Sequence, residues 1–367
     1  MALTPRPARL RVALALVLVA SLAAACGGDK KSPPTTVKRT TTTAPPSAPL
    51  TGLPQTDAAK LTRPALMVKV DNTPNGVAVQ EGLDKADVVF VEMVEGGQTR
   101  IAAVYHSHDA TVGPVRSART SDVEIAGALN KPLLAYSGAN GGVLGQVRSG
   151  PLVDAGIDQR AVTSIYQRNQ RGRSVYRFFL PTADLYGARG AEGATPAPLF
   201  QYRTKKEAAQ GEAVKSASVR YGATTAEYAW DAGTKSWDRI QNGAAHVMAG
   251  TKARVSPQNV VILMTPYRDS GFRDVTGAPS PQAVLQGTGE AWFLTGGKLL
   301  KGTWSRPGPV GPFTFSGAFG VPIKLTPGQT FIELAPGVAS AAFVAAPPTT
   351  TTTAKKAKST TTTRKKK

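Results

Sequence analysis

Cys26 is the only cysteine in this chain of 367 residues, and this constrains the fold more than any other feature of the sequence. A chain with a single thiol forms no internal disulfide and no cysteine-rich metal centre. The folded part must therefore be stabilised by burial of apolar side chains. Roughly 300 residues between Leu50 and Ala346 have a composition suited to this, which is enough for two domains of ordinary size.

The segment that ends at Cys26 has the pattern of an export signal. Three arginines precede an apolar run at residues 12–20, and small residues lead to the cysteine. The run is shorter than the roughly 20 residues needed to span a bilayer. It resembles the signals of bacterial lipoproteins, whose lipidated cysteine becomes the first residue, although Ala23 stands where that pattern prefers the leucine found at Leu22. We expect residues 1–25 to be a lipoprotein signal peptide that is removed, and a lipid on Cys26 to anchor the mature protein to the outer face of the cell membrane. An ordinary secretory signal is the alternative.

Both ends of the chain are rich in threonine, proline and lysine. Residues 26–49 and 347–367 hold too few apolar side chains to offset the entropy of ordering, so we predict a disordered tether and a disordered basic tail. The tail carries seven of the +20 net charge. Seven charges without interleaved aromatic residues encode no sequence readout, so we expect no specific nucleic-acid partner. The expected partners are the membrane, through the lipid, and an envelope polyanion or a cell-wall protein; a solvated tail without a partner is the alternative.

The apolar runs divide the folded part into two regions. Strand-like runs at residues 65–70, 87–94, 99–106 and 132–137 are mixed with helical stretches, whereas those at 218–221, 227–230, 259–264, 289–294, 299–304 and 329–334 are separated by glycine and proline. We predict an α+β fold. A mixed α/β domain at 50–200 would be joined by a connector within 189–211 to a smaller, mostly β domain at 213–346.

The densest polar pattern lies at residues 87–119. Glu92 occupies a strand that is apolar on both faces, and a buried carboxylate needs a partner or a chemical role. The run Glu95-Gly-Gly-Gln98 predicts a hairpin with the two glycines at its centre. This register places Glu92 opposite Ile101, and it places Glu95 diagonal to Arg100 on the other face.

Arg116 and Arg119 lie just before a helix predicted to start near Ser121, which has capping-box spacing to Glu124. Guanidinium groups beside a helix start favour a bound carboxylate or phosphate. The predicted anion-binding or ligand-binding residues are Glu92, Glu95, Arg100, Arg116 and Arg119. The alternative is that the arginines only neutralise the two glutamates inside the protein.

Two other motifs give weaker signals. The glycine-rich residues 137–145 follow a predicted strand, and a plain strand-to-helix turn explains them better than a phosphate-binding loop, because no Gly-Lys-Ser/Thr follows. His106 and His108 would share one face of a strand, as two metal ligands could, but the chain holds only His246 to add to them. We predict neither a metal nor a cofactor, and no motif identifies a nucleophilic serine.

Several motifs together resemble the YerB-like family of bacterial lipoproteins. They are Arg63-Pro-Ala-Leu-Met-Val-Lys-Val-Asp-Asn72, Ala86-Asp-Val-Val-Phe-Val-Glu92, Glu95-Gly-Gly-Gln-Thr-Arg100 and Gly113-Pro-Val-Arg-Ser-Ala-Arg119, followed in the second region by Gly289-Glu-Ala-Trp292 and residues 296–304. The resemblance implies a two-domain, membrane-anchored envelope protein and brings no established reaction. The chain departs from the family pattern at Tyr136, where a histidine is expected, and at residues 180–184, where an asparagine is expected.

These patterns favour a non-catalytic binding or scaffolding lipoprotein of the cell envelope, with the charged cluster holding an anionic group. A cell-wall hydrolase or transferase is the alternative, with Glu92 or Glu95 as general acid or base and the arginines stabilising developing negative charge. A solute-capturing lipoprotein would need two similar α/β lobes, and the β-rich second region argues against it.

Overall fold

The computed structural model describes residues 45–169 and 174–347. The predicted signal peptide, Cys26, most of the predicted tether and the tail from residue 348 onward lie outside the described residues. Within the described ranges, no helix combines the length and the apolar character needed to cross a membrane.

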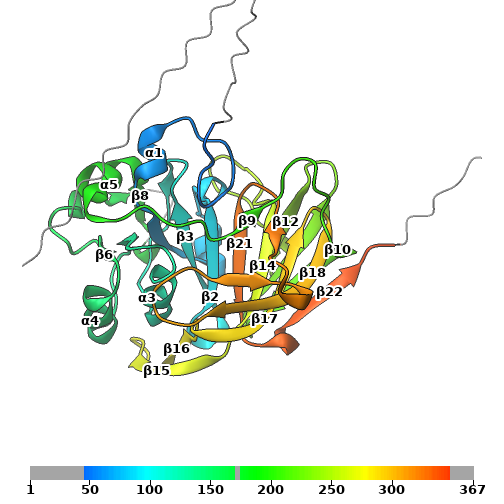
Figure 1. Cartoon of the computed structure of the whole chain (residues 1–367). Coiled ribbons are helices and arrows are strands. Elements are labelled where there is room, and N and C mark those ends of the chain that lie inside the picture. The colour runs from blue at the N-terminus through cyan, green and yellow to red at the C-terminus, as the bar shows by residue number, and fades with distance from the viewer. Residues whose placement is uncertain (1–44, 170–173, 348–367) are drawn as a thin grey trace, which may run out of the picture. The chain divides into compact units, whose positions relative to one another are not determined.

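One large mixed sheet organises the described residues (Figure 1). Its strands lie in the order β13-β12-β11-β10-β18-β17-β14-β21-β2-β3-β1-β5-β6, with β19 paired to β18 and β22 paired to β10. Their bounds are β1 (Leu66–Asp71), β2 (Val88–Met93), β3 (Thr99–Tyr105), β5 (Leu133–Ala135), β6 (Val153–Asp154), β10 (Glu212–Arg220), β11 (Thr225–Asp231), β12 (Ser236–Gln241), β13 (Ala244–Ala245), β14 (Asn259–Met264), β17 (Gly287–Thr295), β18 (Lys298–Arg306), β19 (Thr314–Ser316), β21 (Thr330–Ala335) and β22 (Ala341–Ala345).

Three smaller sheets and five α-helices complete the described fold. The small sheets pair β4 (Thr111–Val112) and β7 (Gln167–Arg168) with β8 (Phe178–Pro181), β9 (Gln201–Tyr202) with β20 (Lys324–Leu325), and β15 (Tyr267–Arg273) with β16 (Pro279–Ala283). The helices are α1 (Ala58–Thr62), α2 (Pro74–Val77), α3 (Thr120–Ala126), α4 (Gly141–Ser149) and α5 (Thr182–Arg189). Short 3-10 turns are η1 (Leu83–Lys85), η2 (Glu95–Gly97), η3 (Thr163–Ile165), η4 (Ser174–Tyr176), η5 (Gly190–Glu192), η6 (Ala318–Gly320) and η7 (Val338–Ser340).

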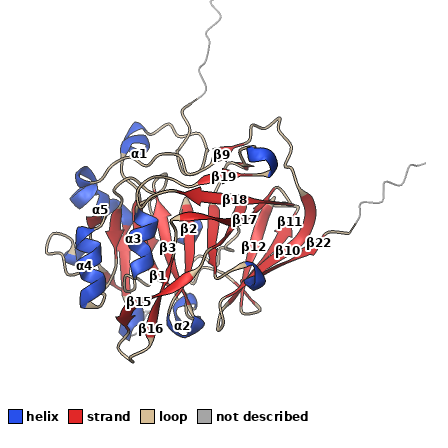
Figure 2. Ribbon diagram, turned by 60° about the horizontal axis from the view of Figure 1, so that its bottom comes forward, coloured by secondary structure: helices blue, strands red, loops and turns tan. Residues whose placement is uncertain are grey.

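The predicted α+β class is confirmed. All five α-helices of the described ranges precede residue 190, and Figure 2 shows α3, α4 and α5 gathered at one end of the sheet, away from β10, β11 and β22. The apolar runs predicted as strands in both regions form strands. The β15–β16 hairpin was not predicted, because most of β15 is polar and faces solvent. The predicted domain boundaries stay a prediction.

The central strands are buried on both faces, so the sheet has a core on each side. Successive residues of β2 alternate between the two cores, with Val89 and Val91 in one and Val88 and Phe90 in the other. Continuous apolar runs are expected of strands covered on both faces, since neither face can be polar. This explains why β1, β2, β3 and β14 carry almost no alternation of apolar and polar residues.

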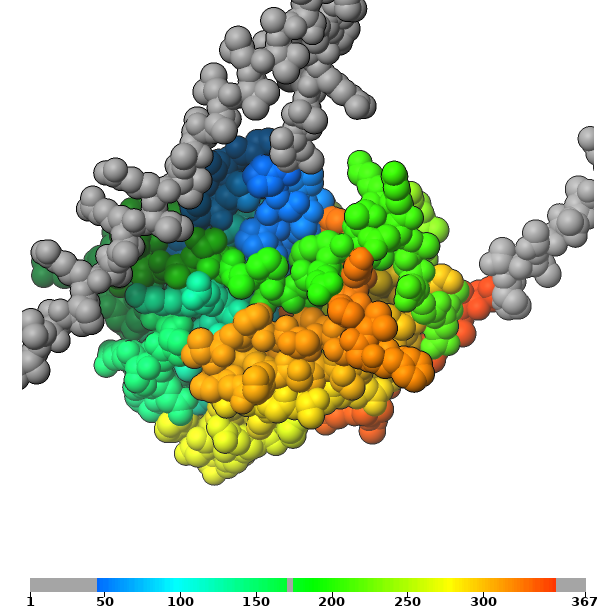
Figure 3. Space-filling model, in the orientation of Figure 1, coloured from blue at the N-terminus to red at the C-terminus, as the bar shows by residue number. Residues whose placement is uncertain are grey.

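Parallel pairing of β21 with β2 joins the two regions of the chain. Val88 lies opposite Thr330 and Phe90 opposite Ile332, while the other edge of β21 pairs with β14. Figure 3 shows the yellow and orange segments of the second region packed directly against the teal segments of the first. One such contact joins the Arg306 guanidinium of β18 to the Glu124 carbonyl of α3 at 2.7 Å.

A buried polar network lies where the two regions meet. Glu333 of β21 is fully buried and accepts hydrogen bonds from the hydroxyls of Tyr221 (2.8 Å) and Tyr228 (2.5 Å). Arg239 of β12 donates to the Tyr228 hydroxyl at 3.1 Å and lies 2.7 Å from His246 Nδ1. Burial raises the pKa of Glu333, although Arg239 and the two tyrosines oppose that rise. Because each member needs the others for its hydrogen bonds, the network favours one arrangement of the strands.

Candidate functional site

A row of charged side chains crosses three neighbouring strands on the face that α3 covers. Asp71 of β1 lies opposite Arg100 of β3, and Arg100 lies opposite Glu92 of β2. Residues opposite one another in antiparallel strands share a face, so these three side chains point the same way. Lys69 shares the face because it lies two residues before Asp71 in β1. The sheet order β2-β3-β1 thus gathers charges from two motifs that are distant in the sequence.

This arrangement corrects the predicted hairpin. The register with Glu92 opposite Ile101 is wrong by one residue, because the turn is longer than two glycines. Val94 N donates to the Gln98 carbonyl at 2.8 Å, and the turn η2 lies between them. Gly97 has a φ of +69°, and its carbonyl accepts from Ala223 N (3.0 Å) in the β10–β11 turn. A contact from the other region of the chain therefore fixes a loop that looks local in the sequence.

Lys69 is the ion-pair partner of Glu92, in place of Arg116 or Arg119, the arginines considered above as groups that could neutralise it. Its ammonium lies 2.5 Å from Glu92 Oε1 and 2.6 Å from Asp122 Oδ1, and all three side chains are fully buried. Burial raises the pKa of Asp122 to about 7; Lys69 opposes this rise and Glu92 adds to it. The ammonium thereby joins two strands of the sheet to helix α3.

The helix α3 begins one residue earlier than predicted and has a different cap. Arg119 N donates to the Asp122 carboxylate at 2.7 Å, so Asp122 occupies the position that was assigned to Glu124. Ser121 is buried, and its hydroxyl accepts from Ala283 N of β16 at 3.0 Å. The predicted Ser121–Glu124 capping box is therefore wrong, and a carboxylate already sits at the helix start where an anion was expected to bind.

The two arginines of the predicted site form separate ion pairs. Arg116 Nε donates to Asp71 Oδ2 at 2.6 Å, and the Arg116 side chain is 22% exposed. Arg119 donates to Glu95 Oε2 from Nη2 (2.8 Å) and from Nε (3.2 Å). Burial of Glu95 raises its pKa, but the hydrogen bonds from Arg119 and Ser280 outweigh this, and the pKa is lowered overall. We call Arg100, Arg116, Arg119, Asp71 and Glu95 the arginine cluster.

Arg100 lies beneath this pair of surface arginines. It is 4% exposed, and within the described ranges its Nε and Nη1 have no hydrogen-bond partner. Its Nη2 lies 3.9 Å from Asp71 Oδ2. Burial lowers the pKa of Arg100 to about 10; Asp71 opposes this, and the neighbouring arginines add to it. Three arginines and two carboxylates form this cluster, and Glu92, opposite Arg100, is a further negative charge that acts on Arg100.

The other predicted motifs have structural roles. Residues 137–145 form the expected strand-to-helix turn, in which the Asn140 side chain caps α4 by accepting from Val143 N at 2.8 Å. The buried Tyr136 hydroxyl donates to Asp154 at 2.9 Å. His106 is also buried, with Nε2 3.1 Å from the Arg63 carbonyl. Among the described residues, no group of three or more histidine, cysteine or carboxylate side chains is placed to hold a metal ion.

Glu92 is not placed to exchange a proton with a ligand, whereas Glu95 lines a surface cavity of about 320 Å³ but is engaged by two donors. Glu92 is fully buried and bound to Lys69, and Glu95 is held by Arg119 and Ser280 with a lowered pKa. A general acid or base needs both access to its substrate and a pKa near the working pH. Lys69, Asp71 and Asp122 were not among the predicted site residues. The only sequence signal for the first two was a lysine and an aspartate two residues apart in an apolar strand.

The fold and this site define an α+β protein whose mixed α/β and mostly β regions share one sheet. The chain belongs to the family described as "Protein of unknown function (DUF3048)", whose N-terminal domain matches residues 50–195 and whose C-terminal domain matches residues 217–332. A relative from Bacillus subtilis (strain 168), named "Putative lipoprotein YerB", is 27% identical over 316 residues, which cover 80% of this chain and 88% of the relative. The predicted resemblance to the YerB-like family is confirmed.

A solved structure has the same fold. The crystal structure of the YerB protein from Bacillus subtilis superimposes with a TM-score of 0.70 at 24% sequence identity, covering 81% of this chain and 99% of that chain. The two regions and their shared sheet are therefore a property that this chain has in common with a solved protein.

Lys69→Met tests the buried ion pairs. The variant keeps a similar side-chain volume but leaves Glu92 and Asp122 facing each other without a cation, so we expect the free energy of unfolding to fall by about 3–5 kcal/mol. Urea unfolding of the full-length chain at pH 8, followed by tryptophan fluorescence, measures the loss. Adding Glu92→Gln to the variant should recover part of the stability. A loss below about 1 kcal/mol would contradict a central role for this interaction.

Asp122→Asn tests the raised pKa of Asp122. The native carboxyl keeps its proton up to about pH 7, whereas the unfolded chain releases it near the ordinary value of about 4. The native state binds more protons between these values, so the contribution of Asp122 to stability falls as the pH rises from about 4 to about 7.

The measurement is the difference in unfolding free energy between pH 5 and pH 8. Wild type should lose more stability over this interval than Asp122→Asn. The buried His246, whose lowered pKa acts in the opposite direction, contributes equally to both proteins. Asp184→Asn, a change at an exposed aspartate, is the matched control and should follow wild type. Parallel curves for wild type and Asp122→Asn would contradict the assignment.

Proposed function

We propose that the protein is a lipoprotein anchored to the outer face of the cell membrane through Cys26. The support is the leader at residues 1–25, the single cysteine that ends it, and the lipoprotein name of the Bacillus subtilis relative. The threonine-rich and proline-rich residues that follow would hold the folded body away from the membrane surface.

Cys26→Ala tests the anchor. Wild type expressed in a bacterial host with its own leader should sediment with membranes and incorporate labelled fatty acid, because the thiol is the attachment point. The variant should lose the label and appear in the soluble fraction. Ser32→Ala in the same segment is the control and should behave as wild type. Retention of the label in Cys26→Ala would exclude this anchor.

For the folded body we propose a non-catalytic binding or scaffolding role, in which the arginine cluster holds an anionic group of a cell-wall polymer or partner protein. The observation that carries the proposal is the partial exposure of the Arg116 side chain within a cluster that holds three arginines. Of the three side-chain nitrogens of Arg116, only Nε has a hydrogen-bond partner within the described residues. Its two terminal amino groups are therefore left for a ligand. Planar, doubly donating groups of this kind suit carboxylate and phosphate oxygens.

Arg100 and Tyr176 support Arg116 in this role. Arg100 contributes a buried charge that Asp71 neutralises only in part, at 3.9 Å, and buried charges act over longer distances than solvated ones. The Arg116 guanidinium also lies over the Tyr176 ring, 5.8 Å from its centre, which restricts the directions that it can take. An anion that binds at Arg116 would therefore accept hydrogen bonds from a guanidinium group whose orientation is already restricted.

The alternative of a wall-directed hydrolase or transferase has less support. It requires Glu92 or Glu95 to act on a substrate. Glu92 is fully buried beneath α3, and Glu95 accepts hydrogen bonds from Arg119 and Ser280. The binding function needs no change in these contacts.

Arg116→Gln tests the binding function. The full-length chain in detergent is heated with poly(glycerol phosphate) or with soluble peptidoglycan fragments that carry free carboxylates. A probe at about one hundred times its dissociation constant should add about 2.7 kcal/mol to wild type, because it binds only the native state. Arg116→Gln should lose this gain. Arg220→Gln, at an exposed arginine on β10, should retain it. An equal gain in Arg116→Gln, or no gain with any probe, would contradict the proposal.

A further inference from the structure

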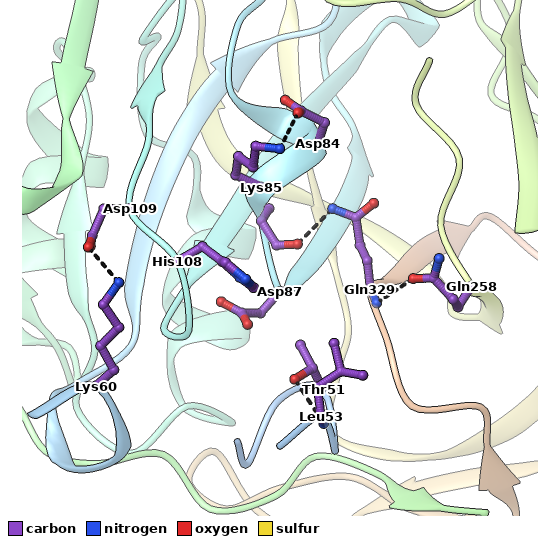
Figure 4. Close-up of a pocket in the computed structure, with 11 residues that line it drawn as sticks. Thr51, Leu53, Lys60, Asp84, Lys85, Asp87, His108, Asp109, Gln258 and Gln329 are labelled. Carbon is purple, nitrogen blue, oxygen red and sulfur yellow. Dashed lines mark hydrogen bonds and ion pairs between the residues drawn. The ribbon is translucent and has the colours of Figure 1, made fainter. Parts of the chain in front are cut away.

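A polar cavity lies apart from the arginine cluster and shares no residue with it. Its volume is about 520 Å³, within the range of small-molecule sites. Both regions of the chain line it: Thr51, Leu53 and Asp87 come from the first, and Gln258 and Gln329 come from the second (Figure 4).

Asp87 is the unusual residue of this cavity. Its side chain stands at the start of β2 and is 1% exposed. Oδ2 accepts hydrogen bonds from the backbone N–H groups of His106 (2.5 Å) and Ser107 (2.9 Å). Oδ1 is buried and has no hydrogen-bond partner within the described ranges. Buried polar atoms nearly always have a partner, and an unpaired carboxylate oxygen is among the most costly to leave without one.

The other charges of the cavity are already paired. Lys60 lies 2.9 Å from Asp109, which also accepts from Arg63 at 2.7 Å. Lys85 lies 3.1 Å from Asp84. Figure 4 draws both lysine–aspartate pairs as dashed lines, while the Asp87 carboxylate stands between His108 and the Thr51–Leu53 segment with no line to any drawn residue. Asp87 is thus the one lining carboxylate of the described residues without an ion pair, although its charge acts on the buried His106 and opposes the lowering of that pKa by burial.

The neighbouring amide does not supply the missing donor. Gln329 Nε2 donates to the backbone carbonyls of Leu83 (2.8 Å) and Ala86 (2.6 Å), which fixes that side chain against the loop before β2. Leu53 offers the opposite kind of surface, an apolar side chain that is 38% exposed at the cavity. The cavity therefore combines a carboxylate that has one unpaired oxygen with an apolar wall.

We propose that this cavity binds a primary ammonium group carried on a short aliphatic chain. The ammonium donates to Asp87 Oδ1 and compensates its charge, and the carbon chain packs against Leu53. A hydroxyl would supply the hydrogen bond without the charge. A divalent metal ion would need more ligands than one carboxylate oxygen, and the described residues hold no group of metal ligands here. The proposal does not depend on anion binding at Arg116.

Calorimetric titration of the full-length chain in detergent with 1,5-diaminopentane tests the site, with 1,5-pentanediol as the matched neutral probe. Wild type should bind the diamine at least tenfold more tightly than the diol, because the hydrogen bond to Asp87 is then charge-assisted. Asp87→Asn keeps an oxygen for the backbone N–H groups and should bind the diamine at least tenfold more weakly. Asp84→Asn removes a lining carboxylate that is already paired, and it should stay within threefold of wild type.

Leu53→Trp is a second variant that leaves every contact of Asp87 intact. Leu53 is partly exposed, so the larger ring should fill the cavity without disturbing the core, and diamine binding should weaken at least tenfold. Equal affinity for diamine and diol in wild type, no diamine binding at 10 mM, or unchanged binding in Asp87→Asn or Leu53→Trp would each overturn the proposal.

Discussion

The structure of the first region depends on the ion pairs that the buried ammonium of Lys69 forms with Glu92 and Asp122. Glu92 comes from the sheet and Asp122 from α3, and burying both as charged groups there requires a cation. Asp122 also receives the N–H of Arg119, so the same carboxylate that binds the ammonium fixes the start of the helix. The position of α3 in turn determines where the side chains of Arg116 and Arg119 reach the surface. The buried ion pairs of Lys69 thus determine the geometry of these partly exposed arginines.

A second buried carboxylate has the corresponding role between the two regions. Glu333 lies in β21, which pairs with β2, and its hydrogen bonds come from the tyrosines of β10 and β11. Arg239 and His246 extend the network to Gln80 of the first region, whose side chain lies 2.5 Å from His246 Nε2. Buried polar networks of this kind favour one register of the strands, since a shift would leave more buried groups unpaired. The two regions are therefore joined both by the pairing of β21 with β2 and by these hydrogen bonds.

The sequence predicted the strands well, but it predicted much less well which side chains pair with one another. Runs such as residues 87–94 and 259–264 predicted strands correctly because burial on both faces demands apolar residues throughout. The pairing of Glu92 was not predictable, since Lys69 reaches it only through the sheet order β2-β3-β1. The hairpin register failed for a similar reason: Ala223, from the other region, holds the turn at Gly97. The unpaired oxygen of Asp87 has no sequence signal, because it depends on which donors are absent around it.

The place of β21 in the sheet has a consequence for how the chain is made. This strand lies between β14 and β2, although residues 330–335 are among the last of the described chain. Until they are synthesised, the apolar edge of β2 has no neighbour on that side and can pair with any exposed strand. Pairing across such a sequence separation is slow, because a long loop must close first. A product that stops before Thr330 is therefore expected to be an aggregation-prone fragment and not a smaller working protein, which makes the chain through Ala335 a condition for solubility.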